Sequence, residues 1–290
     1  MAKRASRVGI PIGYKIAALR KMARTIANHP GNRYNRAARL AAAFGFQMTG
    51  RLLKRRKLTR IGTHSYMWAD VHNGASFKAY CGNPPDWSEM TAWRRLLRRG
   101  DLFIDVGANS GSYTLWAADA GAEVIAIEPD TASRHLLLEN IALNGYSVEV
   151  LPIALGPEPG RMLLTSGLGV NYLLPDGTDG SSRVPSQEVV VETLDNVIGD
   201  LTAKGVKIDV EGAELLVLQG ARRALAEQRI RCIQLEWNLS SLSPLGTGRQ
   251  PVALLLDGYG YGLFRPDSQG ELHFVEQVTD DADVFAMPLG

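Results

Sequence analysis

The chain has 290 residues, and its content of 45% hydrophobic and 21% charged residues excludes a disordered or collagen-like protein. Its two cysteines are too few for a disulfide framework, and its sequence contains no apolar run of about 18 residues that would span a bilayer. The net charge of +2 is unevenly distributed, because residues 1–60 hold 16 lysines and arginines and no acid, whereas the remainder holds 16 basic and 30 acidic residues. We therefore expect a reduced, cytoplasmic protein with a basic arm and an acidic body.

Residues 1–60 are predicted to form a helical arm. Apolar residues recur at steps of three and four over 14–27, with lysines and arginines between them, which is the pattern of an amphipathic helix. This helix should end near His29, because Pro30 disfavours helical backbone in the residue before it. A weaker apolar stripe over 37–52, which includes Phe44 and Leu52, predicts a second helix.

The basic character of the arm leaves several roles open. Such helices can dock on the acidic body, lie on an anionic membrane surface as a peripheral contact, or hold a nucleic-acid backbone. Nucleic acid is the least favoured partner, because the arm has no aromatic-interleaved basic run and no RNA-binding signature. An arginine-rich, acid-free N-terminus is also typical of a mitochondrial presequence, so a targeting role stays open as well.

Residues 61–100 are predicted to join the arm to the body. Two runs with aromatic side chains, 65–71 and 75–80, stand on either side of Asn73 and Gly74. An Asn-Gly pair between such runs is a strong sign of a β-hairpin, so we expect a small β segment here. A helix with Trp93 on its apolar side should follow.

Strand and helix patterns alternate through the predicted body, residues 101–290. Strands are expected near 102–106, 123–127, 148–152, 206–210 and 230–237, with two more near the C-terminus. This alternation indicates an α/β domain with a mostly parallel sheet covered by helices. Ligands of such sheets bind outside the carboxyl ends of the strands, so the site is expected there.

The first of these strands runs into a glycine turn and then into a helix, in the sequence LFIDVGANSG of residues 102–111. Gly107 and Gly111 allow positive φ and a close approach of the backbone to a ligand. The second strand ends in Glu128, seventeen residues after Gly111. A carboxylate at this place accepts both ribose hydroxyls of an adenosine moiety in dinucleotide folds.

Details of the turn favour a methyl donor over a dinucleotide. The third glycine of a GxGxxG motif is missing, so the turn is not built for a pyrophosphate. Asp105 would repel a pyrophosphate but suits the ammonium group of S-adenosylmethionine, directly or through water. Asn109 is expected to hydrogen-bond the carboxylate of the donor or to settle the turn. We predict an S-adenosylmethionine site formed by Asp105, Gly107, Asn109, Gly111 and Glu128.

These motifs resemble those of the FkbM-type S-adenosylmethionine-dependent methyltransferases. The resemblance runs from about residue 100 to 240 and rests on IDVGANSG at 104–111, IEP at 127–129, ETLD at 192–195, KIDVEGAE at 207–214 and VLQGA at 217–221. It implies a Rossmann-like class I methyltransferase fold with a seven-stranded, mostly parallel sheet. It also implies O-methyl transfer to a hydroxyl of a sugar, glycolipid, polyketide or other secondary metabolite.

Two acidic blocks are expected at the carboxyl rim of the sheet. Asp209 and Glu211 follow the strand beside the first one, where one of them can take the proton of an acceptor hydroxyl. Alternatively, Asp209 orders the loop and Glu211 caps the following helix. Glu236 and Asn238 end the next strand on the same face, and with Asp209 they offer oxygen ligands for Mg²⁺. A structural role for these carboxylates is favoured over the metal site.

Two other functions stay open beside methyl transfer to a small hydroxylated or lipid-linked acceptor. An RNA methyltransferase would use the basic arm to contact phosphates. A binding module without catalysis would keep the donor site and lack an active acceptor site. The sequence does not choose the acceptor or the oligomeric state.

Overall fold

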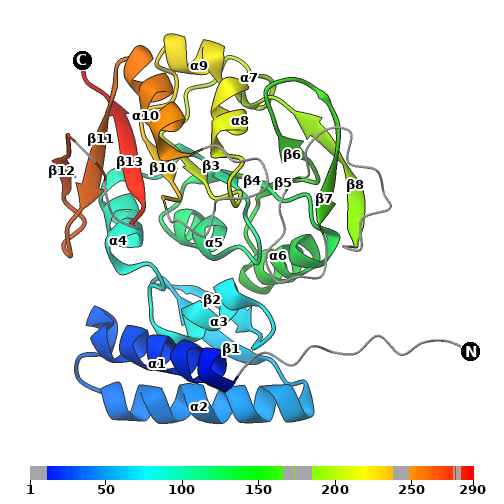
Figure 1. Cartoon of the computed structure of the whole chain (residues 1–290), viewed down its shortest axis with the longest axis vertical. Coiled ribbons are helices and arrows are strands. Elements are labelled where there is room, and N and C mark those ends of the chain that lie inside the picture. Colours follow the sequence, from blue (N-terminus) through cyan, green and yellow to red (C-terminus); the bar gives the residue numbers. More distant parts are fainter. Residues whose placement is uncertain (1–11, 166–172, 174–184, 238–247, 277, 279–281) are drawn as a thin grey trace, which may run out of the picture.

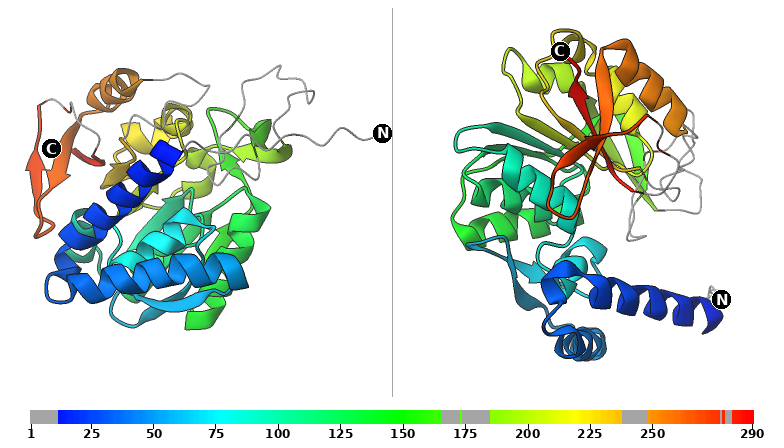
Figure 2. Two further views of the ribbon diagram at one scale, coloured as in Figure 1. Left: turned by 60° about the horizontal axis from the view of Figure 1, so that its bottom comes forward. Right: turned by 90° about the vertical axis from the view of Figure 1, so that its left-hand side faces the viewer.

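The computed structural model describes residues 12–165, 173, 185–237, 248–276, 278 and 282–290 (Figure 1). Two helices come first, α1 (Ile12–Asn28) and α2 (Arg36–Leu53), joined by a turn that contains the 3-10 helix η1 (Pro30–Asn32). Both predicted helices of the arm are thus confirmed. They lie side by side at one end of the molecule, away from the large sheet (Figures 1 and 2). Among the described residues, no helix is both long and apolar enough to cross a bilayer.

The turn between α1 and α2 is anchored on a later segment. The Asn32 side-chain amide is buried and donates to the carbonyl oxygens of Ile26 at 3.0 Å and Cys81 at 2.8 Å. The buried His29 ring forms a 2.7 Å hydrogen bond with the carbonyl oxygen of Pro84. Since buried polar groups need such partners, these bonds set the position of the two helices relative to residues 81–84.

The segment after α2 differs from its prediction. β2 (Ser65–Ala69) forms, but it pairs with β1 (Lys57–Ile61) as an antiparallel hairpin, and the next element is a helix, α3 (Gly74–Cys81). The hairpin predicted around Asn73 is therefore wrong. The cause is local, because the Asn73 side chain accepts a hydrogen bond from the Ser76 N–H at 2.8 Å and caps α3. The expected boundary at residue 60 falls inside β1.

Helix α4 (Trp87–Leu96) leads into the body, where strands and helices alternate as expected. In chain order the elements of the body are β3 (Leu102–Val106), α5 (Ser112–Asp119), β4 (Glu123–Ile127), α6 (Thr131–Asn144), β5 (Glu149–Leu151), β6 (Ala154–Leu155), β7 (Gly160–Thr165), β8 (Ser186–Glu192), α7 (Leu194–Ile198), β9 (Gly205–Ile208), α8 (Glu214–Gln219), α9 (Arg222–Ala226), β10 (Ile233–Leu235), α10 (Arg249–Gly258), β11 (Tyr261–Pro266), β12 (Leu272–Phe274) and β13 (Val284–Pro288).

The large sheet has the strand order β12-β11-β13-β10-β9-β3-β4-β5. Neighbours from β5 through β10 are parallel, whereas β13 is antiparallel to both β10 and β11. The chain therefore has the expected Rossmann-like α/β fold with a mostly parallel sheet. One detail differs, since the short strand β12 adds an eighth strand at the edge beside β11. Strands β6, β8 and β7 form a separate three-stranded sheet.

Both faces of the large sheet are buried. Along β3, Ile104 and Val106 belong to the core that includes residues of α7 to α10, whereas Phe103 packs in the core of α4 and α5. Side chains that alternate in this way place helices on both sides of the strands (Figure 1). In the same register, Asp105 of β3 is the direct neighbour of Lys207 of β9. This pairing brings the glycine turn and the second acidic block to one rim.

Candidate active site

A cavity of about 620 Å³ lies at the carboxyl ends of β3, β4 and β9. Its walls come from the glycine turn, from residues 127–130 after β4, from the acidic rim after β9 and β10, and from residues 70–86 before the body. This is the place where a parallel α/β sheet binds ligands. The structure brings Gly107, Asn109 and Glu128 together with Asp209, Glu211 and Glu236 on this cavity.

The glycine turn is held tightly against the neighbouring strands. Gly107 has a φ of +77°, and a Cβ there would lie 2.0 Å from the backbone oxygen of Asp209. Only glycine allows this contact and this backbone conformation together. The N–H groups of Gly107 and Ala108 both donate to the carbonyl of Ile127 at 3.0 Å. Gly111, with a φ of +92°, starts α5 and does not line the cavity.

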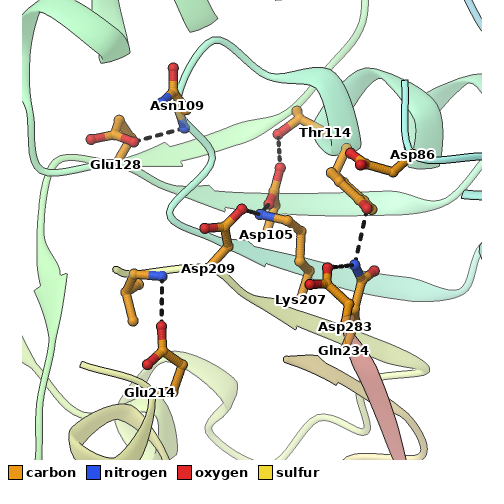
Figure 3. Close-up of polar contacts among 12 residues, drawn as sticks. Asp86, Asp105, Asn109, Thr114, Glu128, Lys207, Asp209, Glu214, Gln234 and Asp283 are labelled. Carbon is orange, nitrogen blue, oxygen red and sulfur yellow. Dashed lines mark hydrogen bonds and ion pairs between the residues drawn. The ribbon is translucent and has the colours of Figure 1, made fainter. Parts of the chain in front are cut away.

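Glu128 contributes a buried carboxylate to the wall of the cavity. The side chain accepts a hydrogen bond from the backbone N–H group of Asn109 at 2.7 Å (Figure 3) and another from that of Asp130 at 2.8 Å, one on each oxygen. Burial outweighs these bonds and raises the pKa of Glu128 to about 7. Each carboxylate oxygen has a second lone pair, so Glu128 can accept two further hydrogen bonds from a ligand.

Asp105 is completely buried and does not line the cavity. It accepts a 2.6 Å hydrogen bond from the Thr114 hydroxyl, and its other oxygen lies 3.7 Å from the Lys207 ammonium. Direct contact of Asp105 with a ligand stays a prediction. The contacts that the structure does give Asp105 connect it to Lys207.

Lys207 is a site residue to which the sequence analysis assigned no role. It is 4% exposed, and its ammonium lies 3.0 Å from the Asp209 carboxylate (Figure 3). The ammonium also lies 4.9 Å from the centre of the Tyr113 ring. Burial disfavours the charge, but Asp209 and Asp105 outweigh it and raise the pKa of Lys207 above its usual value. The sequence does contain a signal for this role, because Lys207 stands two positions before Asp209 at the end of a buried strand, and residues two apart on a strand lie on the same face.

Asp209, Glu211 and Glu236 form an acidic cluster in which each offers an oxygen within 4.8 Å of the others. Burial opposes ionisation of Asp209, but pairing with Lys207 prevails and holds the pKa of Asp209 below its usual value. Burial, then the charges of Asp209 and Glu211, raise the pKa of Glu236 above its usual value, and Glu236 shares a hydrogen bond with Asp209.

Glu211 is the third member of this cluster, and its backbone has a φ of +53°. Burial, then the neighbouring acids Asp209 and Glu214, raise the pKa of Glu211 to about 7. Within the described part of the chain, Glu211 makes no hydrogen bond to the N-terminal turn of α8, so it does not cap this helix as the alternative expected. Glu211 lines the cavity instead. The N–H groups of Val210 and Gly212, which precede the helix, donate to Glu214 at 3.3 Å and 3.1 Å.

The magnesium set that the sequence suggested is described only in part. Asp209 and Glu236 lie together, whereas Asn238 falls outside the described residues. The Lys207 ammonium already pairs with Asp209 at 3.0 Å. A magnesium site at these residues stays a prediction.

The family model for the FkbM methyltransferase domain matches residues 105–261. The chain belongs to the FkbM methyltransferase family. Solved structures that are similar to this chain match it at low identity. An FkbM methyltransferase from Methylobacillus flagellatus is 18% identical with a TM-score of 0.44, over 95% of this chain and 60% of that one. This chain thus spans about 60% of the length of that relative.

Two further relatives act on RNA according to their descriptions. The T. thermophilus 16S rRNA N2 G1207 methyltransferase, solved with AdoMet and guanosine, is 17% identical with a TM-score of 0.46, over 81% of this chain and 50% of that one. An rRNA methylase from Streptococcus thermophilus is 12% identical with a TM-score of 0.40, over 69% and 94%. Comparison with curated proteins finds no match.

One wall of the cavity lies outside the FkbM domain. The Asn73 side-chain amide donates to the Asn109 side chain at 2.8 Å, and Lys78 and Asp86, which form an ion pair, line the cavity beyond it. All three residues precede residue 105, where the family match begins. The predicted hairpin covered Asn73 and Lys78, so the sequence analysis did not place these two residues at the site, although an asparagine three positions before a serine is also a helix-capping pattern.

Proposed function

We propose that this FkbM-family chain is an S-adenosylmethionine-dependent O-methyltransferase that acts on a hydroxyl of a sugar, glycolipid, polyketide or other secondary metabolite. One observation carries the proposal. Glu128, whose carboxylate can accept hydrogen bonds from ribose hydroxyls, lines the same cavity as the carboxylates of Asp209 and Glu211. A donor and an acceptor hydroxyl bound in this cavity would therefore meet near a group that can take a proton.

The residues present fit the donor. The Glu128 carboxylate has lone pairs left for two hydroxyls, and the glycine turn brings backbone to the cavity wall without a side chain at Gly107. The cavity of about 620 Å³ falls in the usual range of small-molecule sites. Bound there, S-adenosylmethionine would supply an electrophilic methyl group.

Asp209 and Glu211 suit two different tasks toward an acceptor hydroxyl. Asp209 stays ionised beside Lys207, so it can accept a hydrogen bond and orient the hydroxyl. Glu211, with a pKa of about 7, is matched to proton removal at neutral pH. Positioning supplies a large part of the acceleration in such a transfer, and proton removal adds to it.

Isothermal titration calorimetry tests the donor site. Folded protein should bind S-adenosylmethionine and its demethylated product, and Glu128→Gln should weaken both. Binding of NAD in place of the methyl donor would contradict the proposal.

A mass-spectrometric screen tests the acceptor class. Extracts of small metabolites and of RNA should be incubated with enzyme and donor, and the products searched for the gain of one methyl group. Methylation of a hydroxylated metabolite supports the proposal, methylation of RNA alone favours an RNA methyltransferase, and donor binding without any product favours a non-catalytic module.

A further inference from the structure

The outward face of α2 is apolar. Phe44, Met48 and Leu52 follow one another at steps of four, so they lie along one side of the helix. Their side chains are 51%, 58% and 76% exposed. Exposed apolar side chains gathered in a row on a helix are typical of a contact surface. We call these three residues the α2 stripe.

The packing side of α2 is a different one. Ala43, Phe46 and Gly50 are buried, and the Phe46 ring lies 4.7 Å from that of Tyr80 and 6.0 Å from that of Phe77. Phe46 and Phe44 are two residues apart and thus point to opposite sides of the helix. The α2 stripe is therefore not the surface with which the arm docks on the rest of the chain.

Charge around the α2 stripe is entirely positive within the arm. Residues 1–60 carry no acid. Arg51, Lys54 and Arg55 are exposed near Leu52, and Arg33 and Arg36 are exposed near the other end of α2. A second copy docked arm to arm would bring like charges together, and the acidic body of a second copy would complement the charges but not the apolar stripe. A surface that is anionic and apolar just below its charges would complement both features.

We propose that the α1–α2 arm docks on an anionic lipid bilayer, with α2 lying in the plane of the surface. The α2 stripe enters the boundary between headgroups and acyl chains, and the flanking lysines and arginines contact anionic headgroups. Nucleic acid fits this face less well, because three apolar side chains occupy its middle where phosphates would need partners.

The docked helix is close to the cavity. α2 packs on α3, and Gly74, Ala75 and Lys78 of α3 line the cavity. The geometry thus favours a lipid-linked acceptor over a freely soluble one, a step that rests on the proposed function. Docking on lipid is independent of that function and is tested without any activity measurement.

Vesicle flotation of the full chain tests the docking. Wild-type protein should float with vesicles of phosphatidylcholine and phosphatidylglycerol and not with phosphatidylcholine alone. The variant Phe44→Gln/Met48→Gln/Leu52→Gln should lose binding by about tenfold or more, since apolar burial is removed while helix propensity is kept. Its melting temperature should stay near that of the wild type, because these side chains are exposed.

A matched control removes the same kind of side chain elsewhere. Leu138, Leu201 and Leu254 are 48%, 57% and 63% exposed on the body, and their joint replacement by glutamine should leave vesicle binding unchanged. Equal binding by the α2 variant and wild type, or equal loss in the control, would overturn the proposal. Absence of vesicle binding by the wild type would also overturn the proposal. Self-association through α2 or retention of an RNA oligonucleotide would then show which other partner this face has.

Loss of donor binding in an otherwise vesicle-binding protein would contradict the proposed function and leave the docking intact. Loss of vesicle binding in a protein that still binds the donor fully would contradict the docking and leave the proposed function intact. The two proposals are therefore distinguished by the same set of variants.

Discussion

The Lys207 ammonium lies 3.0 Å from the Asp209 carboxylate, and the two residues stand two positions apart at the end of β9. Lys207 is buried, whereas the Asp209 side chain is 38% exposed toward the cavity. The lysine thus connects the interior, where it also lies near Asp105, with a carboxylate that a ligand can reach. We regard Lys207 as a positioning residue that keeps Asp209 ionised.

Replacement Lys207→Met should reduce the free energy of unfolding by about 3–5 kcal/mol, because it leaves a buried carboxylate at Asp105 without its cation. The double variant with Asp105→Asn should be more stable than Lys207→Met alone, since the unpaired charge is then gone. Urea unfolding measures both. A double variant less stable than the single one would contradict this account.

The same replacement should also move the pH dependence of the rate. Without the nearby ammonium, the pKa values of both Asp209 and Glu211 should rise, because Lys207 lowers both of them. The fall in rate that Glu211 sets near pH 7 should therefore begin at a higher pH than in the wild type. A purely structural lysine would lower stability and leave this pH unchanged. Rate measurements over the pH range in which the variant stays folded decide between the two.

Replacement Asp209→Asn should lower the turnover rate with little change in donor affinity or melting temperature, because the shape is kept and the charge that orients the acceptor hydroxyl is lost. Replacement Glu211→Gln should lower the turnover rate by about 10²- to 10⁴-fold, the usual contribution of a placed proton acceptor. It should also remove the fall in rate below about pH 7 that the raised pKa of Glu211 predicts. Steady-state kinetics and thermal melts should be recorded together. If Asp209→Asn lowers melting temperature and donor affinity together, Asp209 only orders its loop, and a full-rate variant would end the catalytic assignment.

Donor affinity should depend on the protonation of Glu128. Burial raises the pKa of Glu128 to about 7, so its carboxylate is present above this pH and lost below it. Hydrogen bonds from ribose hydroxyls need the ionised form, and affinity should therefore fall about tenfold between pH 8 and pH 6. Calorimetry with Glu128→Gln should give weaker binding that no longer changes over this range. The same pH slope in the variant would assign the effect to another group.

Replacement Gly107→Ala should destabilise the protein by about 3 kcal/mol or more, because it adds a clash to an unfavourable positive φ. Gly145→Ala is the matched control, since Gly145 has a φ of +66° but no atom within 4 Å of a Cβ. The control should cost only about 1–2 kcal/mol. Equal losses in thermal or urea unfolding would mean that the close approach to Asp209 does not matter.

Local patterns in the sequence were sufficient for the α/β fold and for part of the site. The strand before Gly107 and the strand before Glu128 follow from periodicity and turn chemistry within short windows, so their neighbouring positions could be predicted. The second acidic block could be placed on the same rim because parallel strands share a carboxyl edge. The resemblance of the sequence motifs to the FkbM family added methyl transfer as the class of reaction.

The assignment of single side chains depended on neighbours distant in the sequence. Lys207 acquires its role because β9 lies beside β3, which places its ammonium between Asp105 and Asp209. Asn73 lines the site because α3 folds back onto the glycine turn, where its amide reaches Asn109.

The succession of strands and helices, the glycine turn and the acid at the end of β4 follow from the sequence alone, since they depend on contacts within a few residues. The buried side of α2, in contrast, follows only from the packing of the folded chain. In the stripe predicted over residues 37–52, Phe44 and Leu52 are exposed, whereas Leu40 packs against a buried cluster. Phe46, which the prediction did not include, is buried, because apolar residues stand on more than one side of this helix and their period does not say which side meets the protein. The partner of each face is a matter of long-range packing, which a local period does not contain.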